Sequence, residues 1–173
     1  MDFLYILYKI KSKIFRNNEI IIDYYRKKGV KIGDNCLICS NILTKEPKLI
    51  SIGSNVTISV NVAFVTHDNS IKLILPDKSD LFGTISIGDN CFVGENSLIL
   101  YGCNIGNNVI IAAGSVVTKS WSEENIIIGG NPARKIGDWE TFRRKSKDFA
   151  VLRHDVILEE NPDNTFLIRR QCK

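Results

Sequence analysis

The stretch IGDNCFVGENSLILYGCNIGNNVIIAAGSVV, residues 87–117, repeats with a period of six. The first position of each hexad is a branched or large apolar residue, and its register is unbroken from Ile87 to Val117. The same position recurs earlier in the chain, and the whole set comprises Ile32, Ile38, Ile52, Ile58, Phe64, Ile87, Val93, Ile99, Ile105, Ile111 and Val117. Self-similarity at a fixed period is typical of repeat architectures. The pattern therefore predicts a solenoid in which each hexad buries one apolar side chain.

Three further positions of the hexad each have a preferred residue type. The second position is often glycine, at Gly33, Gly53, Gly88, Gly94 and Gly106. The fourth is often asparagine, at Asn35, Asn41, Asn55, Asn61, Asn90, Asn96 and Asn108. The fifth is mostly small or β-branched, at Cys36, Val56, Val62, Cys91, Ser97, Cys103, Val109 and Ser115. Glycine and asparagine tolerate positive φ, so we expect them at corners, and we expect the fifth position to face the interior near a corner.

Three hexads make one triangular coil of about eighteen residues. Simple period-two alternation would instead favour a sandwich, but it does not explain why glycine and asparagine return every six residues. The periodicity therefore predicts an all-β fold, a parallel β-solenoid over residues 30–137. It does not determine the hand of the coil, since parallel crossovers are normally right-handed.

The register breaks twice. Two extra residues stand around Thr44–Pro47, between the hexads that begin at Ile38 and Ile52. The phase is then lost over residues 67–84, between Phe64 and Ile87. Insertions in solenoids form loops that often build the binding face. We therefore expect residues 67–84 to protrude from one corner.

Helical segments are expected at both ends of the solenoid. Within residues 1–29, the apolar residues 3, 6, 7, 10 and 14 have the spacing of an amphipathic helix. This face could pack on the body of the protein, on a neighbouring subunit or on the inner membrane surface. In residues 138–173, the segment from Asp138 to Arg153 is expected to be a helix that caps the solenoid, with Trp139, Phe142, Phe149 and Leu152 as its apolar face.

The bulk composition is that of an ordinary soluble chain. Of 173 residues, 44% are hydrophobic and 24% are charged, and the net charge is +4. This charge is too small, and too evenly spread, to predict a nucleic-acid partner. With no secretion signal in the sequence, we expect a cytoplasmic protein.

The five cysteines do not predict a disulfide framework, because their number is odd and no secretion signal accompanies them. Cys36 and Cys39 form a C-x-x-C pair that could serve zinc binding or redox chemistry, but no second pair follows at zinc-ribbon spacing and neither histidine is near in sequence. The fifth-position cysteines 36, 91 and 103 are interpreted as small buried hydrophobes. No metal is expected.

Beyond the hexads, two motifs carry a family resemblance. Residues 112–119, AAGSVVTK, and residues 130–134, GNPAR, resemble those of the hexapeptide-repeat acyltransferases. Residues 46–53, EPKLISIG, and 64–68, FVTHD, are similar to a subgroup of sugar and polysaccharide O-acetyltransferases associated with capsule, O-antigen or exopolysaccharide clusters. The resemblance implies a left-handed parallel β-helix. It also implies a homotrimer that binds acetyl-CoA between adjacent solenoids, where the active sites lie.

Acetyl transfer to a hydroxyl group needs a general base, a donor for the oxyanion and a thioester held beside the nucleophile. His67 stands at the start of the protruding loop and matches the general base of the family, whereas His154 lies outside the motif. Asp68 is a poor partner for His67, because neighbours in extended chain point apart. Glu95, reaching across the subunit interface, or a backbone carbonyl could orient the His67 ring.

The resemblance places the cosubstrate along a row of residues. The contacts that it implies are Phe92 with pantetheine, the backbone at Gly94 and Glu95 with the thioester, Ala113 with pantetheine amides, and Thr118, Lys119 and Arg134 with the phosphates or adenosine. Phe92 could instead pack at a subunit interface, and the two cations could be simple surface charges. A further basic residue of the family is replaced by Gly137, for which Lys135 or Arg143 could substitute. The candidate acceptor contacts are Asn41, Glu46 and Asn61.

These features predict O-acetylation of a saccharide by acetyl-CoA. Transfer to another small acceptor, such as an amino sugar nucleotide, serine or an antibiotic, is the alternative. Serine acetyltransferases carry a long N-terminal helical domain and a second catalytic histidine, and neither is evident. A different class is a catalytically silent scaffold or a carbonic-anhydrase-like zinc protein, but the latter needs several solenoid histidines and only His67 is available.

Overall fold

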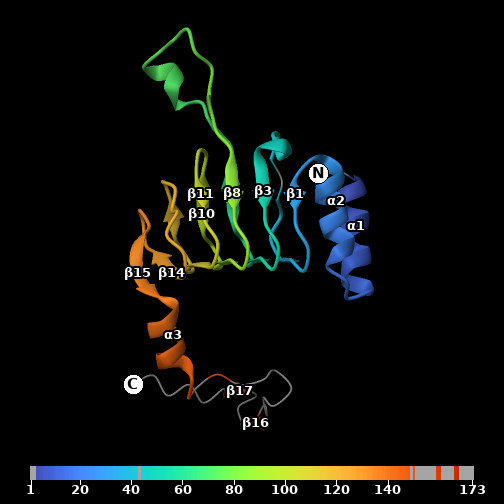
Figure 1. The fold of residues 1–173 in the computed structure, drawn as a ribbon. Coiled ribbons are helices and arrows are strands. Elements are labelled where there is room, and N and C mark those ends of the chain that lie inside the picture. Colours follow the sequence, from blue (N-terminus) through green and yellow to red (C-terminus); the bar gives the residue numbers. More distant parts are fainter. Residues whose placement is uncertain (1–2, 43, 149, 151–158, 161–165, 168–173) are drawn as a thin grey trace. The chain divides into compact units, whose positions relative to one another are not determined.

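The computed structural model describes residues 3–42, 44–148, 150, 159–160 and 166–167 (Figure 1). The chain forms two compact units, Met1–Asp138 and Trp139–Lys173. The second unit contains α3 (Trp139–Ser146) and the hairpin of β16 (Glu159–Glu160) and β17 (Phe166–Leu167). The predicted helix therefore ends at Ser146, and its role as a cap stays a prediction. Several residues considered above lie outside the described part, namely Phe149, Leu152, Arg153, His154 and Cys172.

The first unit begins with two helices, α1 (Phe3–Ile14) and α2 (Glu19–Lys28), and continues as short strands in three sheets. The first sheet contains β1 (Lys31–Ile32), β3 (Ile50–Ile52), β8 (Ile85–Ile87) and β11 (Asn104–Ile105). The second contains β2 (Leu37–Ile38), β4 (Thr57–Ile58), β9 (Phe92–Val93), β12 (Val109–Ile111), β14 (Ile126–Gly129) and β15 (Arg134–Asp138). The third contains β5 (Ala63–Val65), β10 (Leu98–Leu100) and β13 (Val116–Val117). All strand pairs in these sheets are parallel except β14 with β15.

The chain visits the three sheets in rotation: β8, β9 and β10 lie in the first, second and third sheet, and β11, β12 and β13 repeat this order. Between these two turns of the coil, paired residues are eighteen positions apart, as in Ser86 with Asn104 and Leu98 with Val116. This order is what a three-sided coil requires. The pairing also locates the interruptions, because Lys31 pairs with Ser51, twenty residues on, and Ser51 pairs with Ser86, thirty-five residues on.

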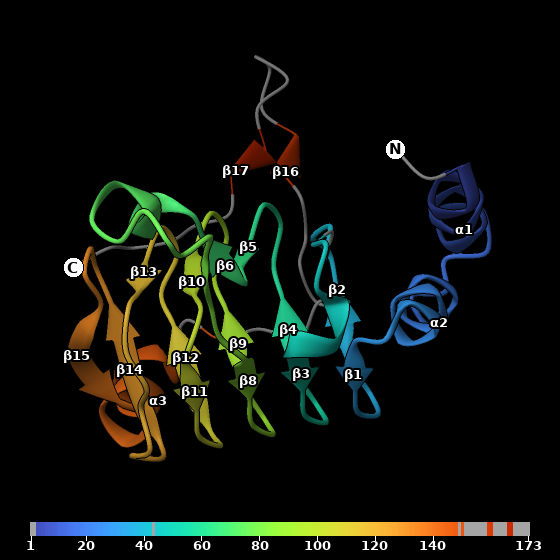
Figure 2. The same ribbon diagram turned by 90° about the horizontal axis from the view of Figure 1, so that it is seen from above.

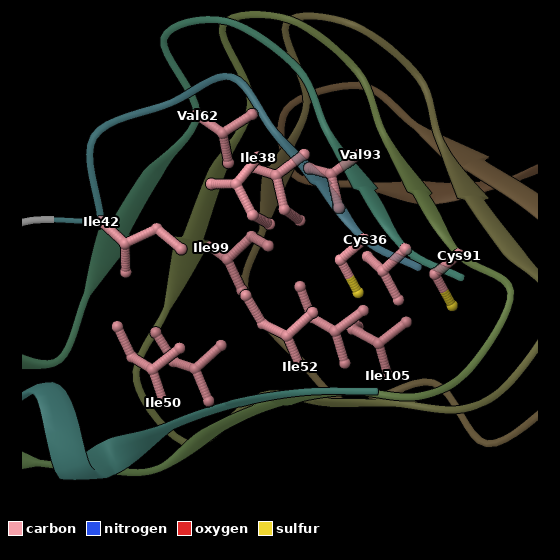
Figure 3. Packing of buried hydrophobic residues seen from close by; sticks show 14 of the residues in the cluster. Cys36, Ile38, Ile42, Ile50, Ile52, Val62, Cys91, Val93, Ile99 and Ile105 are labelled. Carbon is pink, nitrogen blue, oxygen red and sulfur yellow. The ribbon is translucent and has the colours of Figure 1, made fainter. Parts of the chain in front are cut away.

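The core is built from the first and fifth positions of the hexad, as the sequence predicts. Every residue of these two sets is buried except Ile32 and Phe64, which are partly buried. Figure 3 shows side chains from successive turns of the chain pointing into one interior, with the sulfur atoms of Cys36 and Cys91 among the isoleucines. The Cys36 thiol donates to the Gly53 carbonyl at 3.1 Å. Burial raises the pKa of the thiols of Cys36, Cys91 and Cys103, so these three cysteines serve the core as predicted.

The fourth-position asparagines turn the corners. Six of the seven have φ between 55° and 59°, namely Asn35, Asn55, Asn61, Asn90, Asn96 and Asn108. Asn41 is the exception. Its side-chain oxygen accepts hydrogen bonds from the hydroxyl of Tyr5 and, at 2.9 Å, from the ammonium of Lys9. Asn41 therefore connects the coil to α1.

The second-position glycines have a different role from the one expected, and that prediction is wrong. None of them has positive φ. A Cβ added to Gly33 would lie 2.7 Å from the carbonyl carbon of Gly53, and one added to Gly88 would lie 2.7 Å from that of Gly106. Successive coils approach each other so closely at this corner that most of these positions leave no room for a side chain. Gly106 is the roomiest, with its nearest neighbour at 3.3 Å.

The N-terminal helices cover the free edges of the first two sheets. The Asn18 amide donates to the carbonyl of Ile38 and accepts from its N–H, as a neighbouring strand would. Arg26 donates to the carbonyls of Ile32 and Gly33. An uncovered strand edge is a site of aggregation, so α2 and its flanking residues protect the first coil.

Helix α1 does not bury the face that the sequence predicts. Tyr5 and Tyr8 face α2, and Tyr5 is buried there. The apolar residues of the predicted face are all exposed, namely Phe3, Ile6, Leu7, Ile10 and Ile14. Of the alternatives for this face, packing on the body of the protein is therefore wrong.

Candidate functional site

The loop that interrupts the repeat begins at His67. Strand β6 (His67–Asp68) pairs antiparallel with β7 (Leu81–Phe82), and a short 3-10 helix, η2 (Ser70–Leu73), follows β6. This loop projects away from the coil (Figure 1). His67 pairs with Phe82 across the neck of the loop, and their ring centroids are 5.7 Å apart. The neck therefore fixes the backbone of His67 and shields one side of its ring.

A carboxylate from the preceding coil holds the His67 ring. His67 Nδ1 lies 2.9 Å from Glu46 Oε2, which also accepts hydrogen bonds from the hydroxyls of Thr66 at 2.7 Å and Thr44 at 3.1 Å. Glu46 precedes the 3-10 helix η1 (Pro47–Leu49), in the segment with two extra residues. Hydrogen bonds from Thr66 and His67 lower the pKa of Glu46. Glu46 is therefore ionised at neutral pH and can only accept.

The acceptor at Nδ1 decides which nitrogen of His67 is basic. An ionised carboxylate cannot donate, so Nδ1 carries a proton, and in the neutral form of the ring Nε2 is the nitrogen with the lone pair. The His67 side chain is 37% exposed, against 24% for that of Glu46. The arrangement thus presents a fixed, accessible base that can take a proton from a hydroxyl group.

The His67 ring borders an open hollow of about 340 Å³. Its lining consists of Thr44, Lys45, Phe64, Val65, Thr66 and His67. Lys45 is exposed and brings a positive charge to the same hollow. The lining therefore combines a base, a cation and apolar surface.

The acidic residues near His67 differ from the expectation. Glu46, expected to contact the acceptor, is the partner of the base. Glu95 is exposed, and its backbone carbonyl accepts from the N–H of Gly114 at 2.8 Å. Its role across a subunit interface stays a prediction, but within the chain Glu46 orients His67. Asp68 accepts from the N–H of Ser70 at 2.8 Å, which lowers its pKa.

Neither asparagine proposed for the acceptor lines this hollow. The Asn41 side chain is held by α1, as described above, and Asn61 is an exposed corner residue with φ 57°. One sequence signal could have identified Glu46. The two extra residues place an acidic side chain beside the base of the loop, and a carboxylate there is a natural partner for an imidazole.

Several residues expected to contact the cosubstrate lie on neighbouring coils. Phe92, in β9, is 43% exposed. A Cβ added to Gly94 would lie 2.4 Å from the nitrogen of Ala113, so these two residues are in contact. The residues expected to contact pantetheine and the thioester, from Phe92 through Gly94 to Ala113, therefore lie next to one another in a strip.

The residues expected to contact the phosphates or adenosine, Thr118, Lys119 and Arg134, lie on segments that meet at β13. The N–H of Ala133 donates to the carbonyl of Val116 at 2.8 Å, which ties the segment before Arg134 to the strand that Thr118 and Lys119 follow. All three are exposed, and the Lys119 ammonium lies 4.7 Å from the centroid of the Trp121 ring. The two cations are therefore on segments that pack together, as an anionic ligand would require.

The basic residues considered as substitutes at Gly137 are placed differently. The Lys135 ammonium pairs with Glu123. Arg143 lies in α3, in the second unit, and pairs with Glu140. Within the described chain the Lys135 ammonium is therefore occupied by the ion pair with Glu123.

The structure places His67 and Gly94 at different corners of the coil. His67 follows β5 and precedes β8, at the corner between the third and first sheets. Gly94 follows β9 and precedes β10, at the corner between the second and third sheets. Within one chain His67 is thus apart from Gly94, whereas Thr118 and Lys119 follow β13, which stacks in the same sheet as β5, and so lie at the corner of His67.

The described residues contain no group of three histidine, cysteine or acidic side chains placed to hold a metal ion. Among these same residues, no helix has both the length and the apolar character needed to cross a membrane.

Comparison with known proteins assigns the chain to a family. A model described as the hexapeptide repeat of succinyl-transferase matches residues 24–43 and 84–119. Protein CapG of Staphylococcus aureus is 44% identical over 142 residues, which cover 79% of this chain and 81% of CapG. The galactoside O-acetyltransferase of Escherichia coli is 32% identical over 109 residues, covering 62% of this chain and 53% of that enzyme.

A solved structure agrees with this assignment. The hexapeptide-repeat-containing acetyltransferase of Vibrio cholerae, complexed with acetyl coenzyme A, superposes with a TM-score of 0.55 at 26% identity. The match covers 65% of this chain and 61% of that one. The repeat, the strand order and these relatives agree, and the chain belongs to the hexapeptide-repeat acyltransferase family.

Proposed function

We propose that this chain transfers an acetyl group from acetyl-CoA to a hydroxyl group of a saccharide, a unit of a capsule, O-antigen or exopolysaccharide. The observation that carries the proposal is the His67–Glu46 pair, which leaves Nε2 basic at the edge of an open hollow. The relatives support it, since they include a galactoside O-acetyltransferase and an acetyltransferase complexed with acetyl coenzyme A. The coil would have the left hand that the family resemblance implies, and the reaction would take place in the cytoplasm.

In the proposed reaction His67 acts first as a base and then as an acid. Nε2 takes the proton of the acceptor hydroxyl while its oxygen attacks the thioester carbonyl. The backbone N–H of Glu95 would donate to the oxyanion that forms. The carbon–sulfur bond then breaks, and the departing thiolate takes the proton from His67. Glu46 keeps its charge throughout and stabilises the protonated ring.

The cosubstrate would follow the strip described above. The exposed ring of Phe92 offers apolar surface to the pantetheine arm, and the backbone at Gly94 and Ala113 offers polar groups. Lys119 and Arg134 would face the phosphates, with Thr118 beside them. Since His67 and Gly94 lie at different corners, a site that joins them needs a second copy of the chain, which supports a homotrimer with intersubunit sites.

The acceptor would enter the hollow beside His67. Lys45 brings a positive charge to that lining. A saccharide bearing a carboxylate or phosphate would therefore bind there better than a neutral one.

An assay of thiol release tests this function. The full chain is incubated with acetyl-CoA and a panel of neutral and acidic saccharides, with serine and an amino sugar nucleotide for comparison. We expect turnover with a saccharide, and a loss of about 10²- to 10⁴-fold in His67→Ala. Calorimetry should give the same affinity for CoA in both proteins. Turnover that does not depend on His67, or none with any hydroxyl acceptor, contradicts the proposal.

A further inference from the structure

Helix α1 is anchored through one face only. Its aromatic face packs on α2, with the rings of Tyr5 and Tyr8 each 5.5 Å from that of Tyr24. Tyr5 is 2% exposed, and its hydroxyl donates to Asn41 of the coil. In Figures 1 and 2, α2 lies between α1 and β1, so α1 is the outermost element at this end. These contacts fix which side of α1 faces outwards.

The outward side of α1 is an apolar stripe. Phe3, Leu7, Ile10 and Ile14 have the i, i+4, i+7, i+11 spacing of one helical face. Their exposed fractions are 73%, 39%, 49% and 70%, and Leu4, Ile6 and Phe15 are exposed beside them. Soluble monomers rarely leave so many large apolar side chains exposed together, and such a patch marks an interaction site.

Positive charges border this stripe on both sides. At 3.6 residues per turn, Lys11 lies on one side of the stripe and Lys13 on the other, and Arg16 follows the helix. Residues 3–18 contain Lys9, Lys11, Lys13 and Arg16 but no aspartate or glutamate. Lysines in these positions can bury their methylene groups beside apolar neighbours while the ammonium stays in water.

This charge distribution decides between two occupants of the stripe. A second copy packed stripe to stripe would bring two rows of like charge together, which is unfavourable. An anionic lipid surface supplies negative charge to the ammonium groups and hydrocarbon to the stripe at once. The helix is about 18 Å long, which suits a position in the plane of the headgroups.

We propose that α1 attaches the protein to an anionic membrane surface, with the stripe in the headgroup region and the lysines at the phosphates. This attachment does not depend on the acetyl-transfer reaction. A single short helix with this charge gives weak, reversible binding that falls with ionic strength.

Co-sedimentation of the full chain with vesicles tests the proposal. We expect binding to vesicles of phosphatidylcholine mixed with phosphatidylglycerol, little binding to phosphatidylcholine alone, and release at high salt. Leu7→Glu/Ile10→Glu should weaken binding at least about tenfold, because it removes apolar contact and adds negative charge. Lys11→Glu/Lys13→Glu should lose at least about 25-fold, since each lysine near the surface contributes roughly fivefold and the substitution also adds negative charge.

Two controls make the result decisive. Lys145→Glu/Lys147→Glu changes the net charge by the same amount as Lys11→Glu/Lys13→Glu, but outside α1, and should still bind. Leu7→Met/Ile10→Leu keeps the stripe apolar and should bind like the original chain. Circular dichroism and sedimentation velocity show whether each variant keeps its fold and assembly. The proposal is overturned if the original chain does not bind anionic vesicles, if the control loses binding equally, or if the stripe variant changes only the oligomeric state.

Discussion

His67 Nδ1 and Glu46 Oε2 lie 2.9 Å apart although twenty-one residues separate them along the chain. Glu46 stands in the shorter insertion of the repeat and His67 at the start of the longer one. Both interruptions of the coil therefore meet at one corner. Each supplies one member of the pair, which is why neither insertion alone explains the site.

Glu46→Gln should separate ring orientation from cosubstrate binding. The amide can turn an N–H toward Nδ1, which then no longer needs the proton that leaves Nε2 basic. We expect kcat to fall about 100-fold, the scale of a misplaced catalytic group, while KM for acetyl-CoA stays unchanged. Steady-state kinetics of thiol release measure both constants.

Glu95→Gln is the matched comparison for this variant, because it removes one carboxylate from the next coil. If Glu46 alone orients the ring, Glu95→Gln retains its kcat. Glu46→Asp, which keeps the charge on a shorter side chain, should lose less than Glu46→Gln. Equal losses in Glu46→Gln and Glu95→Gln would instead assign the orienting role to a contact across subunits.

The same carboxylate should make stability depend on pH. Hydrogen bonds from Thr66, His67 and Thr44 lower the pKa of Glu46 below its ordinary value of 4.5. A lowered pKa stabilises the fold above that value, and this contribution disappears as the pH falls through the folded-state pKa. The Tm difference between the original chain and Glu46→Gln should thus be constant from pH 7 to about 5 and narrow below pH 4.5. A difference unchanged at pH 3 in thermal scans would disagree with this assignment.

Arg134→Ala and Lys119→Ala should weaken acetyl-CoA binding without slowing the chemistry. Removing a charge-assisted contact to phosphate costs about 1.5–3 kcal/mol, or roughly 10- to 100-fold in affinity. If one of these cations contacts the 3′-phosphate, its alanine variant should weaken the binding of CoA but not that of dephospho-CoA. Calorimetry with both ligands measures this difference. Lys135→Ala is the control, since that ammonium pairs with Glu123. A loss in Lys135→Ala as large as in Arg134→Ala would argue against a specific contact.

Substitution of glycine should be costly where coils touch and mild where they do not. A Cβ at Gly88 would meet the side-chain oxygen of Asn107 at 2.5 Å and the carbonyl carbon of Gly106 at 2.7 Å, whereas one at Gly106 has its nearest neighbour at 3.3 Å. We expect Gly88→Ala to destabilise the fold by about 1–3 kcal/mol, the usual cost of overpacking. Gly106→Ala should cost clearly less. Urea unfolding midpoints compare the two, and equal shifts would refute the close-approach explanation.

The hexad pattern was sufficient to predict the strands, the core positions and both interruptions. It succeeded because each side of the coil depends on residues close together in the sequence, namely a buried branched residue and a corner asparagine in most hexads. Even the cysteines at positions 36, 91 and 103 followed from register alone. The explanation for the second-position glycines failed, because the distance between stacked backbones is a property of neighbouring coils and not of one hexad.

The site was harder to predict than the coil. His67 could be identified, since it stands where the pattern stops. Its partner could not, because the contact with Glu46 depends on how two insertions fold against each other. The apolar face of α1 was identified from its spacing, but what it contacts was left open, since helical periodicity does not show that the tyrosine face is the one that packs on α2.

The narrow neck at His67 and Phe82 has an evolutionary consequence. The loop leaves and rejoins the coil between paired residues, and the stacking of Ile85 on Ile50 resumes directly afterwards. Each doubling of a loop's length adds only about 0.6 kcal/mol of closure entropy. The segment of residues 69–80 can therefore vary in length between lineages at little cost to the fold of the coil.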